Sequence, residues 1–429
     1  MSILVLGASG FLGRHVVRAL SGAGHEVVAG VRAPPARGEA GVEYRKVDFN
    51  RASEPRDWMP LLRGVEVVIN TVGIFRESHG SQFRQLHEQA PQALFAACRQ
   101  AGVRRVIQVS ALGADAGARS DYHLSKRAAD EYLLSLPLDA VVVQPSLVYG
   151  AGGTSAALFG MLATLPWIPA PDMGAARLQP IHIDDVTKAV VALVVAPRVP
   201  ASRMALVGPH ALSWREFLVQ LRDALGVESR ARFVRVPSSA MAVLARLGDW
   251  RRGALLDTAA WRMLQRGNSA DVAPLGDLLG HLPRDARRFV APDDAPAQRT
   301  EAKLRWLLPI ARASLAALWI VTGLVSLGIY PLASSYALLQ QAGVPQALQP
   351  LALYGAAMLD IALGLWALVP RRARWLWAVQ GGLIVGYTII ISWRLPVFWL
   401  HPYGPILKNL PLLALLWLLY ELERPWNTR

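Results

Sequence analysis

Tyr122 and Lys126 are the two residues whose types and spacing point most directly to chemistry. They stand four positions apart in Tyr122-His-Leu-Ser-Lys126, a spacing that puts both side chains on one face of a helix. A phenol, with an ordinary pKa of about 10, can exchange a proton with a substrate oxygen near neutral pH when a nearby cation lowers that pKa. The pair therefore predicts a general acid/base, with Tyr122 moving the proton and Lys126 lowering its pKa.

Ser110 is the third candidate for this chemistry. It closes the apolar stretch Val103–Ser110, twelve positions before Tyr122. A strand there would place its hydroxyl near the helix that carries Tyr122, where it could hydrogen-bond the same substrate oxygen. The alternative is that Ser110 simply ends the strand, and the sequence leaves both interpretations open.

A glycine-rich turn near the start of the chain could hold a phosphate. Residues 2–6 form a short apolar strand, and Gly7-Ala-Ser-Gly10-Phe-Leu-Gly13 follows directly, before an amphipathic helix that runs to about Leu20. Glycines permit the tight strand-to-helix turn and a close approach of the backbone, while the free amides and the dipole at the helix start stabilise a pyrophosphate. The turn predicts a dinucleotide site.

Residues that follow the next strands indicate which nucleotide would bind. Val31 is followed by Arg32, where a site for a free ribose 2′-hydroxyl would ordinarily carry an acidic residue, so NADP(H) is favoured over NAD(H). A solvated loop arginine is the alternative. Asp48 could accept a hydrogen bond from the adenine amino group or cap the next turn. The segment Asn70-Thr-Val-Gly73 would lie along the cofactor's path.

The order of the predicted elements gives the fold class. Strand-like and helical stretches alternate, which indicates an α/β Rossmann-type fold with a doubly wound parallel sheet and a small substrate subdomain. We expect residues 1–290 to form this NAD(P)-binding domain, with substrate-side segments at about 150–180 and 205–290, and residues 291–303 to form a linker. After the strand at 2–6, the predicted strands are Glu26–Val31, Glu43–Val47, Val65–Asn70, Val103–Ser110 and Ala140–Gln144.

Composition limits the other classes of function. The chain has 429 residues, of which 53% are hydrophobic, and a formal net charge of +14. Before residue 304 the basic excess is spread without a long run or interleaved aromatic residues, so nucleic acid is not expected as a partner. Cys98 is the single cysteine, which excludes an internal disulfide and a thiolate metal cluster.

His182, Asp184 and Asp185 could suggest a metal site. No second cluster of His or Cys accompanies them in the sequence. A carboxylate at position 184 or 185 is better explained as the N-cap of a helix that starts near Val186. We therefore expect no metal.

The hydrophobic excess is concentrated behind residue 303. Four stretches there are close to, or somewhat shorter than, the roughly 20 apolar residues that cross a hydrocarbon core. Lipid offers no hydrogen-bond partner to a backbone, so residues 304–429 are predicted to form an all-α four-helix transmembrane bundle, in which Gly381, Gly382 and Gly386 would allow close packing. The predicted spans are Trp306–Tyr330, Ala347–Val369, Trp375–Trp393 and Pro405–Tyr420.

Charged residues within and between these spans predict pairing and orientation. An ionisable group inside a span is costly, so Arg312 and Asp360 should face the bundle and pair with one another, whereas Lys408 could pair or reach water from its span end. The loop with Arg371 and Arg372 and the basic tail should lie on the cytoplasmic side. This places the NAD(P)-binding domain and the C-terminus in the cytoplasm, beside a bacterial-type inner or cell membrane.

The first 290 residues resemble the short-chain dehydrogenase/reductase superfamily, in its atypical or extended branch. Within that NAD-dependent epimerase/dehydratase-like branch, the sequence is most similar to the NAD(P)H-binding accessory subunit of respiratory complex I and its bacterial relatives. The resemblance rests on the glycine turn, Ser110, Tyr122 with Lys126, Gln144-Pro-Ser-Leu-Val-Tyr-Gly150, Gln179-Pro-Ile-His-Ile-Asp-Asp-Val186, Gly208-Pro209 and Ser213-x-x-Glu216.

The resemblance implies roles for individual residues. Tyr122 would be the general acid/base, Lys126 its pKa-lowering and ribose-binding partner, and Ser110 the hydroxyl that orients the carbonyl. The interval between Ser110 and Tyr122 is shorter than in the catalytic extended enzymes. The candidate cofactor-binding residues are Gly7, Ser9, Gly10, Phe11, Leu12, Gly13, Arg32, Asp48, Phe49, Asn70, Val72, Gly73, Lys126 and Pro145.

Residues 304–429 resemble the DoxX-like family of small four-span membrane proteins. The likeness rests on the four spans, on Arg312 in the first, on Gly323-Leu324, and on His401-Pro-Tyr-Gly-Pro405-Ile-Leu-Lys408-Asn409 before the last. Relatives in the wider family are linked to quinone, thiol or sulfur redox chemistry, but the likeness supplies no reaction. It makes the lipid bilayer an expected partner.

Two functions from different classes follow. The first is a membrane-anchored NAD(P)-dependent oxidoreductase that acts on a carbonyl or alcohol group of a small-molecule, lipid or quinone substrate. The second is a non-catalytic NAD(P)H-binding sensor or assembly protein for a membrane redox complex. Transport by the helical bundle is a third hypothesis with less support, because nothing in the sequence resembles inverted repeats.

Overall fold

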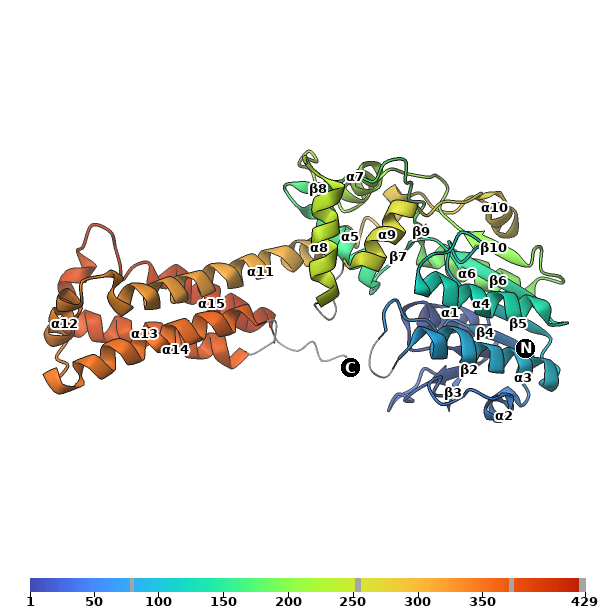
Figure 1. Ribbon diagram of the computed structural model, residues 1–429, viewed down its shortest axis with the longest axis horizontal. Helices are drawn as coiled ribbons and strands as arrows, with labels where there is room; N and C mark the ends of the chain where they lie inside the picture. Colours follow the sequence, from blue (N-terminus) through green and yellow to red (C-terminus); the bar gives the residue numbers. More distant parts are fainter. Residues whose placement is uncertain (78–80, 251–255, 370–373, 424–429) are drawn as a thin grey trace. The chain divides into compact units, whose positions relative to one another are not determined.

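The computed structural model describes residues 1–77, 81–250, 256–369 and 374–423. The chain divides into two compact units, residues 1–302 and residues 303–429. The first unit contains a large sheet and the second consists of helices (Figure 1).

Seven parallel strands form the sheet of the first unit, in the order β10-β6-β5-β4-β1-β2-β3. A parallel sheet covered on both faces needs strands that are apolar on both sides, and residues 3–6 of β1 are all buried. The strand order reverses next to β1, so the predicted Rossmann-type doubly wound sheet is confirmed. The strands are β1 (Ser2–Leu6), β2 (Glu26–Val31), β3 (Val42–Lys46), β4 (Val67–Asn70), β5 (Arg105–Val109), β6 (Asp139–Pro145) and β10 (Arg203–Leu206).

Helices cover both faces of this sheet. One face packs against α1 (Phe11–Gly22), α6 (Ile183–Val195) and α10 (Ala273–Leu279). The other packs against α2 (Pro55–Trp58), α3 (Ala90–Ala101) and α4 (Asp121–Ser135). Cys98 is buried in the second of these layers as a free thiol.

The substrate-side segments form a smaller cluster. The helix α5 (Thr154–Thr164) packs on α7 (Trp214–Ala224), with Phe159 and Phe217 edge to face at 5.1 Å. A two-stranded parallel sheet joins β8 (Ile168–Pro171) to β11 (Phe233–Val236), and a second joins β7 (Val148–Tyr149) to β9 (Ile181–His182). Two further helices, α8 (Ser238–Trp250) and α9 (Thr258–Arg266), lie side by side (Figure 1).

The second unit is a bundle of helices that run alongside one another (Figure 1). Three of its described segments are long and apolar enough to cross a membrane: Ala295–Ile329, Gln346–Leu368 and Arg374–Arg394. They correspond to α11 (Ala295–Leu324), α13 (Gln349–Leu368) and α14 (Arg374–Arg394). The fourth predicted span contains α15 (Asn409–Leu422), an apolar helix of 14 residues. At 1.5 Å per residue it is about 21 Å long, shorter than a hydrocarbon core.

Two details of the second half of the chain differ from expectation. Helix α11 already begins at Ala295, inside the stretch expected to be a linker. The tightest backbone approach is at Gly323 and Gly364 rather than at the predicted glycines. A Cβ on Gly323 would lie 2.6 Å from the Ala357 carbonyl oxygen, and one on Gly364 would lie 2.9 Å from that of Ala316. Nothing lies within 4 Å of such an atom on Gly382 or Gly386, and on Gly381 only a leucine side-chain atom at 3.9 Å does.

The predicted pair of Arg312 with Asp360 is wrong. Arg312 Nη1 instead lies 2.7 Å from Glu423 Oε1, and Trp377 Nε1 donates to the other oxygen of Glu423 at 2.9 Å. The partner of Arg312 is therefore Glu423, the C-cap of α15, and not a residue of α13 as the sequence suggested. Asp360 is buried, and its Oδ1 has no hydrogen-bond partner among the described residues. Lys408 is exposed just before α15, while Arg371 and Arg372 lie outside the described residues.

Candidate functional site

The glycine turn between β1 and α1 forms an open backbone cradle. Gly7 has a φ of 75°, a left-handed conformation that favours glycine. A Cβ on Gly13 would lie only 2.1 Å from the Gly7 carbonyl oxygen, so the turn can close only without a side chain there. Gly10 is the N-cap of α1 and provides no side-chain cap. The first amides of α1 therefore stay available for an anion at the switch point of the sheet.

The side chains of the turn leave its backbone accessible. Ser9 is exposed, and Phe11 and Leu12 are half-buried. The Arg14 guanidinium lies over the Phe11 ring, 5.6 Å from the ring centroid. A Cβ on Gly153, the N-cap of α5, would lie 3.0 Å from the Phe11 ring. The substrate-side segment thus passes close to the start of α1.

The residues expected around the adenosine have different surroundings. Arg32 is exposed directly after β2, where it is accessible to a 2′-phosphate. Asp48 Oδ1 accepts a hydrogen bond from the Asn50 amide at 3.0 Å, so its carboxylate caps a turn, as the alternative interpretation held. The Phe49 ring packs edge to face on Trp58 at 4.9 Å and belongs to the core.

The end of β4 is tied to the neighbouring strand and to α4. Buried Asn70 donates through Nδ2 to Gln108 Oε1 at 2.8 Å and accepts from the Val72 amide at 3.1 Å. Lys126 Nζ donates to the carbonyl oxygens of Val72, at 3.0 Å, and Val109, at 3.2 Å. The ammonium thus connects the ends of β4 and β5. A Cβ on Gly73 would lie 3.0 Å from Lys126 Nζ, so this glycine lets the ammonium approach the backbone.

Tyr122 and Lys126 share a face of α4, as predicted, but their pKa values differ from expectation. Tyr122 is buried, and burial raises the pKa of its phenol, with the negative charge of Asp130 adding to the effect. Burial also lowers the pKa of Lys126 to about 8, against the opposing influence of Asp130. Desolvation is the largest influence on both groups, and Tyr122 is held in its protonated form.

Aromatic rings surround Tyr122. Phe75 stacks on it at 5.3 Å and is itself 73% exposed, so it stands at the opening of the site. His87 lies edge to face at 5.5 Å on another side, and Phe83 lies at 6.0 Å. The His123 ring lies edge to face at 5.2 Å, so the surroundings of Tyr122 are aromatic, with the exposed Phe75 on one side.

His87 is a buried site residue that sequence reasoning missed. Its Nε2 accepts from the Ile74 amide at 2.9 Å, which leaves the ring hydrogen on Nδ1, 3.1 Å from Ser125 Oγ. Ser125 Oγ in turn donates to the Tyr122 carbonyl oxygen at 3.0 Å. Burial, reinforced by the charge of Lys126, lowers the pKa of His87 to about 2, so the ring is neutral. His87 thus joins the segment after β4 to the start of α4.

Asp130 is the second residue that sequence reasoning missed. It stands one turn after Lys126, so the spacing Tyr122-x-x-x-Lys126-x-x-x-Asp130 could have revealed it. Ser110 Oγ donates to Asp130 Oδ2, and Arg203 Nη1 lies 3.7 Å from the same oxygen. Burial raises the pKa of Asp130 to about 6, although Ser110 and the positive charges of Lys126 and Arg203 oppose the rise.

His182, Asp184 and Asp185 lie at the start of a helix in the return segment from the substrate side. Helix α6 begins at Ile183, and its N-cap is His182, which accepts from the Asp184 amide at 3.2 Å. The expectation that Asp184 or Asp185 caps this helix is wrong, because both lie in its first turn and pair with Arg284. No group of three potential metal ligands occurs among the described residues.

Pro145, another residue expected near the cofactor, ends β6. Its carbonyl oxygen accepts a hydrogen bond from the Leu112 amide at 3.0 Å.

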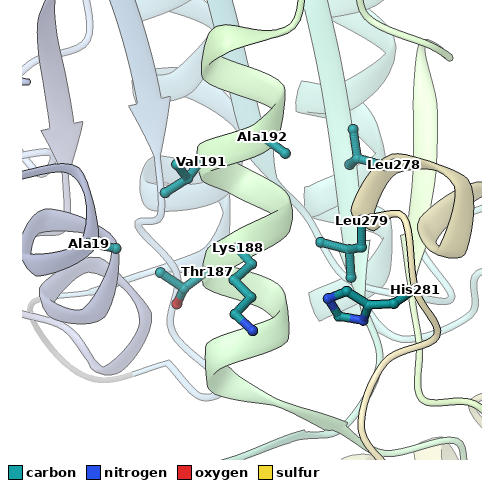
Figure 2. A pocket seen from close by; sticks show the side chains of 8 residues that line it. All are labelled: Ala19, Thr187, Lys188, Val191, Ala192, Leu278, Leu279 and His281. Carbon is teal, nitrogen blue, oxygen red and sulfur yellow. The ribbon is translucent and has the colours of Figure 1, made fainter. Parts of the chain in front are cut away.

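Two cavities border helix α6. Figure 2 shows the first, of about 370 Å³, with Lys188 and Val191 of α6 on one side and Leu278 and His281 on the other. The second, of about 560 Å³, shares Lys188 and His281 and is lined by arginines of the 284–288 segment. Neither is lined by the glycine turn, Tyr122 or Lys126. The candidate site is therefore located by the glycine turn, Tyr122 and Lys126, and not by either cavity.

Known families match both halves of the chain. Residues 7–160 match the NAD(P)H-binding family, and residues 316–417 match the DoxX-like family. Over 278 residues the chain is 30% identical to a protein named ceramide reductase from Caulobacter vibrioides, covering 64% of this chain and 82% of that protein. The chain belongs to the same family of NAD(P)H-binding reductases as this protein. A DoxX-like domain follows its NAD(P)-binding, reductase-type domain.

Two further comparisons, at lower identity, find a similar sequence and a similar fold. The chain is 28% identical over 217 residues to subunit 9 of the NADH dehydrogenase [ubiquinone] 1 alpha subcomplex from mouse mitochondria, covering 48% of this chain and 56% of that subunit. A nucleoside-diphosphate-sugar epimerase from Staphylococcus aureus has the same fold, with a TM-score of 0.54 and 19% identity, over 67% of this chain and 99% of that one. The chain is thus similar both to a protein named as a reductase and to a subunit of a respiratory complex.

Proposed function

We propose that the protein is a membrane-anchored, NADP(H)-dependent oxidoreductase that reduces a carbonyl group on a lipid substrate. The observation that carries this proposal is the position of Tyr122 and Lys126 on the buried face of α4. Lys126 donates hydrogen bonds to the carbonyl oxygens of Val72, just after β4, and of Val109, at the end of β5. The glycine turn follows β1 at the same carboxyl end of the parallel sheet. A nucleotide bound on the turn would bring its nicotinamide toward Tyr122.

The roles divide between the nucleotide and the side chains. Bound NADPH would supply the hydride for the carbonyl carbon. Tyr122 would give its hydroxyl proton to the carbonyl oxygen, and its raised pKa suits this direction because the phenol remains a proton donor at neutral pH. Lys126 would hold the ribose hydroxyls and stabilise the phenolate left after transfer. These roles belong to the proposal.

A lipid substrate and a membrane location are supported by separate features. The relative from Caulobacter is named ceramide reductase, and the exposed Phe75 ring stands over Tyr122. Three apolar helices follow in the same chain. We place residues 1–290 on the cytoplasmic side, because the basic residues between and after the predicted spans are concentrated in one loop and in the tail.

The preference for NADP(H) rests on Arg32. It is exposed directly after β2, where a guanidinium would bind a 2′-phosphate and an acidic residue would repel it. In Arg32→Asp, the ratio of NADPH to NADH affinity should fall at least about tenfold. An unchanged ratio would remove Arg32 from nucleotide recognition.

The deciding experiment measures NADPH oxidation by the full chain in lipid nanodiscs, with a long-chain ketone in the bilayer. Tyr122→Phe should lower kcat at least about 100-fold while NADPH affinity stays unchanged, because the variant loses only the transferable proton. Tyr132→Phe is the matched control, since Tyr132 lies on the same helix. If Tyr122→Phe turns over at the parental rate, Tyr122 is not the acid.

A second function, NAD(P)H binding without turnover, is favoured by one specific observation. The hydroxyl of Ser110 donates to Asp130 and is therefore not free to orient a substrate carbonyl. The likeness to a respiratory-complex subunit points in the same direction. Pull-down of a stable membrane redox complex, together with no turnover across a broad panel of carbonyl compounds, would favour this function.

A further inference from the structure

Helix α8 exposes a continuous apolar face. Val243 is 55% exposed, Leu247 is 54% exposed and Trp250 is 88% exposed, and Leu244 is exposed as well. These positions follow one another at intervals of three and four residues, so they form one stripe along the helix. At 100° and 1.5 Å per residue, the stripe from Val243 to Trp250 is about 120° wide and about 12 Å long.

The opposite face holds α8 in place. Ala245 is fully buried, and a Cβ on Gly248 would lie 1.9 Å from the Leu256 carbonyl oxygen, so the helix rests closely on the backbone that leads into α9. Asp249 also accepts from the Thr258 amide at 2.9 Å. The exposed stripe is therefore the outer face of a packed helix rather than one side of a loose segment.

The sequence around α8 is basic. Between residues 228 and 252 there are six arginines and two acidic residues, with Arg246 exposed on α8 itself. Helices that lie in a membrane interface typically carry an apolar stripe with tryptophan and a basic flank, as α8 does with Trp250 and Arg246. The positive charge complements anionic lipid headgroups.

We propose that α8 docks on the surface of an anionic bilayer, with its axis in the membrane plane and the side chains of Val243, Leu247 and Trp250 inserted among the lipid headgroups. The bilayer is available to it because the same chain carries three helices able to span one. A water-exposed stripe of this size would otherwise favour association.

Membrane docking of α8 would also affect the candidate active site, and this consequence rests on the proposed function. Asp257, the N-cap of α9, pairs with Arg76 at 2.6 Å. The neighbouring Phe75 stacks on Tyr122. The segment on which α8 packs is thus tied to the opening of the Tyr122 site. A lipid ketone could then reach Tyr122 from the bilayer surface.

The test places a nitroxide on α8 in the full chain. In a Cys98→Ala background, Leu247→Cys is labelled and the protein is reconstituted in nanodiscs that contain phosphatidylglycerol. Val219→Cys on α7, also partly exposed, is the matched control. We expect position 247 to be more accessible to oxygen and at least about fivefold less accessible to a water-soluble nickel chelate than position 219, as for a label in the interface.

Three results would overturn the proposal. Equal nickel accessibility at positions 247 and 219 would leave α8 in water. Dipolar broadening between labels at 247 would instead assign the stripe to a second copy of the chain. Low accessibility to both reagents would show that protein covers it. None of these measurements requires turnover, so they stand apart from the proposed reaction.

A kinetic comparison tests the consequence for catalysis. The variant Leu247→Glu with Trp250→Glu should reduce turnover of a bilayer-embedded long-chain ketone at least about tenfold, but leave turnover of a short water-soluble ketone and NADPH affinity unchanged, because a charged stripe is repelled by lipid. Val219→Glu is the control. Equal loss with both ketones would show that α8 does not provide access from the membrane.

Discussion

Ser110 donates its only hydroxyl hydrogen to the carboxylate of Asp130, and both residues are buried. While Asp130 is ionised, Ser110 can offer a substrate only lone pairs. It cannot donate to a carbonyl oxygen in this arrangement. Because of this hydrogen bond, Ser110 is not available to orient a substrate carbonyl, which is the role implied by the resemblance to the reductases.

The first prediction concerns Ser110→Ala and pH. Near pH 8 the substitution should change kcat/KM of ketone reduction less than about tenfold, because the hydroxyl is bound to Asp130. Burial raises the pKa of Asp130 to about 6, so its carboxyl becomes protonated below pH 6 and releases the Ser110 hydrogen. The difference between parent and variant should grow as the pH falls through 6. A 100-fold loss at pH 8 would contradict this.

The second prediction uses two glycines of the same helix. Gly13→Ala should weaken NADPH binding at least about tenfold, because its Cβ would lie 2.1 Å from the Gly7 carbonyl oxygen and force the cradle open. Gly22→Ala is the matched control, since nothing lies within 4 Å of its Cβ position. Fluorescence titration with NADPH measures both. Equal affinity in the two variants would show that the turn does not hold the nucleotide.

The third prediction is an alkaline limit to nucleotide binding. Burial lowers the pKa of Lys126 to about 8, so its ammonium loses its charge as the pH rises through 8. In the proposed function the charged form of Lys126 holds the ribose hydroxyls. NADPH affinity should therefore be greatest below pH 8 and fall above it, by at most about tenfold per pH unit for one proton.

Two variants assign this limit to a residue. Tyr122→Phe should keep it, since the phenol is not the group that titrates. Asp130→Asn should move it to lower pH, because the negative charge of Asp130 holds the pKa of Lys126 up. Isothermal titration from pH 6 to 10 provides the data. A limit that disappears in Tyr122→Phe would assign it to the phenol instead.

The fourth prediction concerns the ion pair of the helical unit. Arg312→Ala should destabilise the protein by about 3 kcal/mol, because it leaves the buried Glu423 carboxylate without its cation. Thermal unfolding in detergent measures the loss. The double variant Arg312→Met with Glu423→Leu should recover most of it, since neither charge remains buried. A double variant as unstable as the single one would contradict an electrostatic origin.

The sequence alone determined the parts of this protein that depend on local spacing. The strands 2–6 and Glu26–Val31 occur as predicted, because a buried parallel strand requires a short apolar run between turn residues. Tyr122 and Lys126 share a helix face because a helix has 3.6 residues per turn. The two halves of the chain separate in composition as they do in space, since lipid and water select different side chains.

The tertiary structure determined the pKa values, which depend on burial, and the pairings between residues that are far apart in the sequence. The pKa of Tyr122 rises because its helix is buried, and no local pattern states how deeply a helix is buried. Ser110 and Asp130 meet across 20 positions, and Arg312 finds Glu423 on the last helix rather than Asp360. Each pairing depends on which helices become neighbours after folding. That choice is made by packing of the whole chain, which spacing within one segment does not encode.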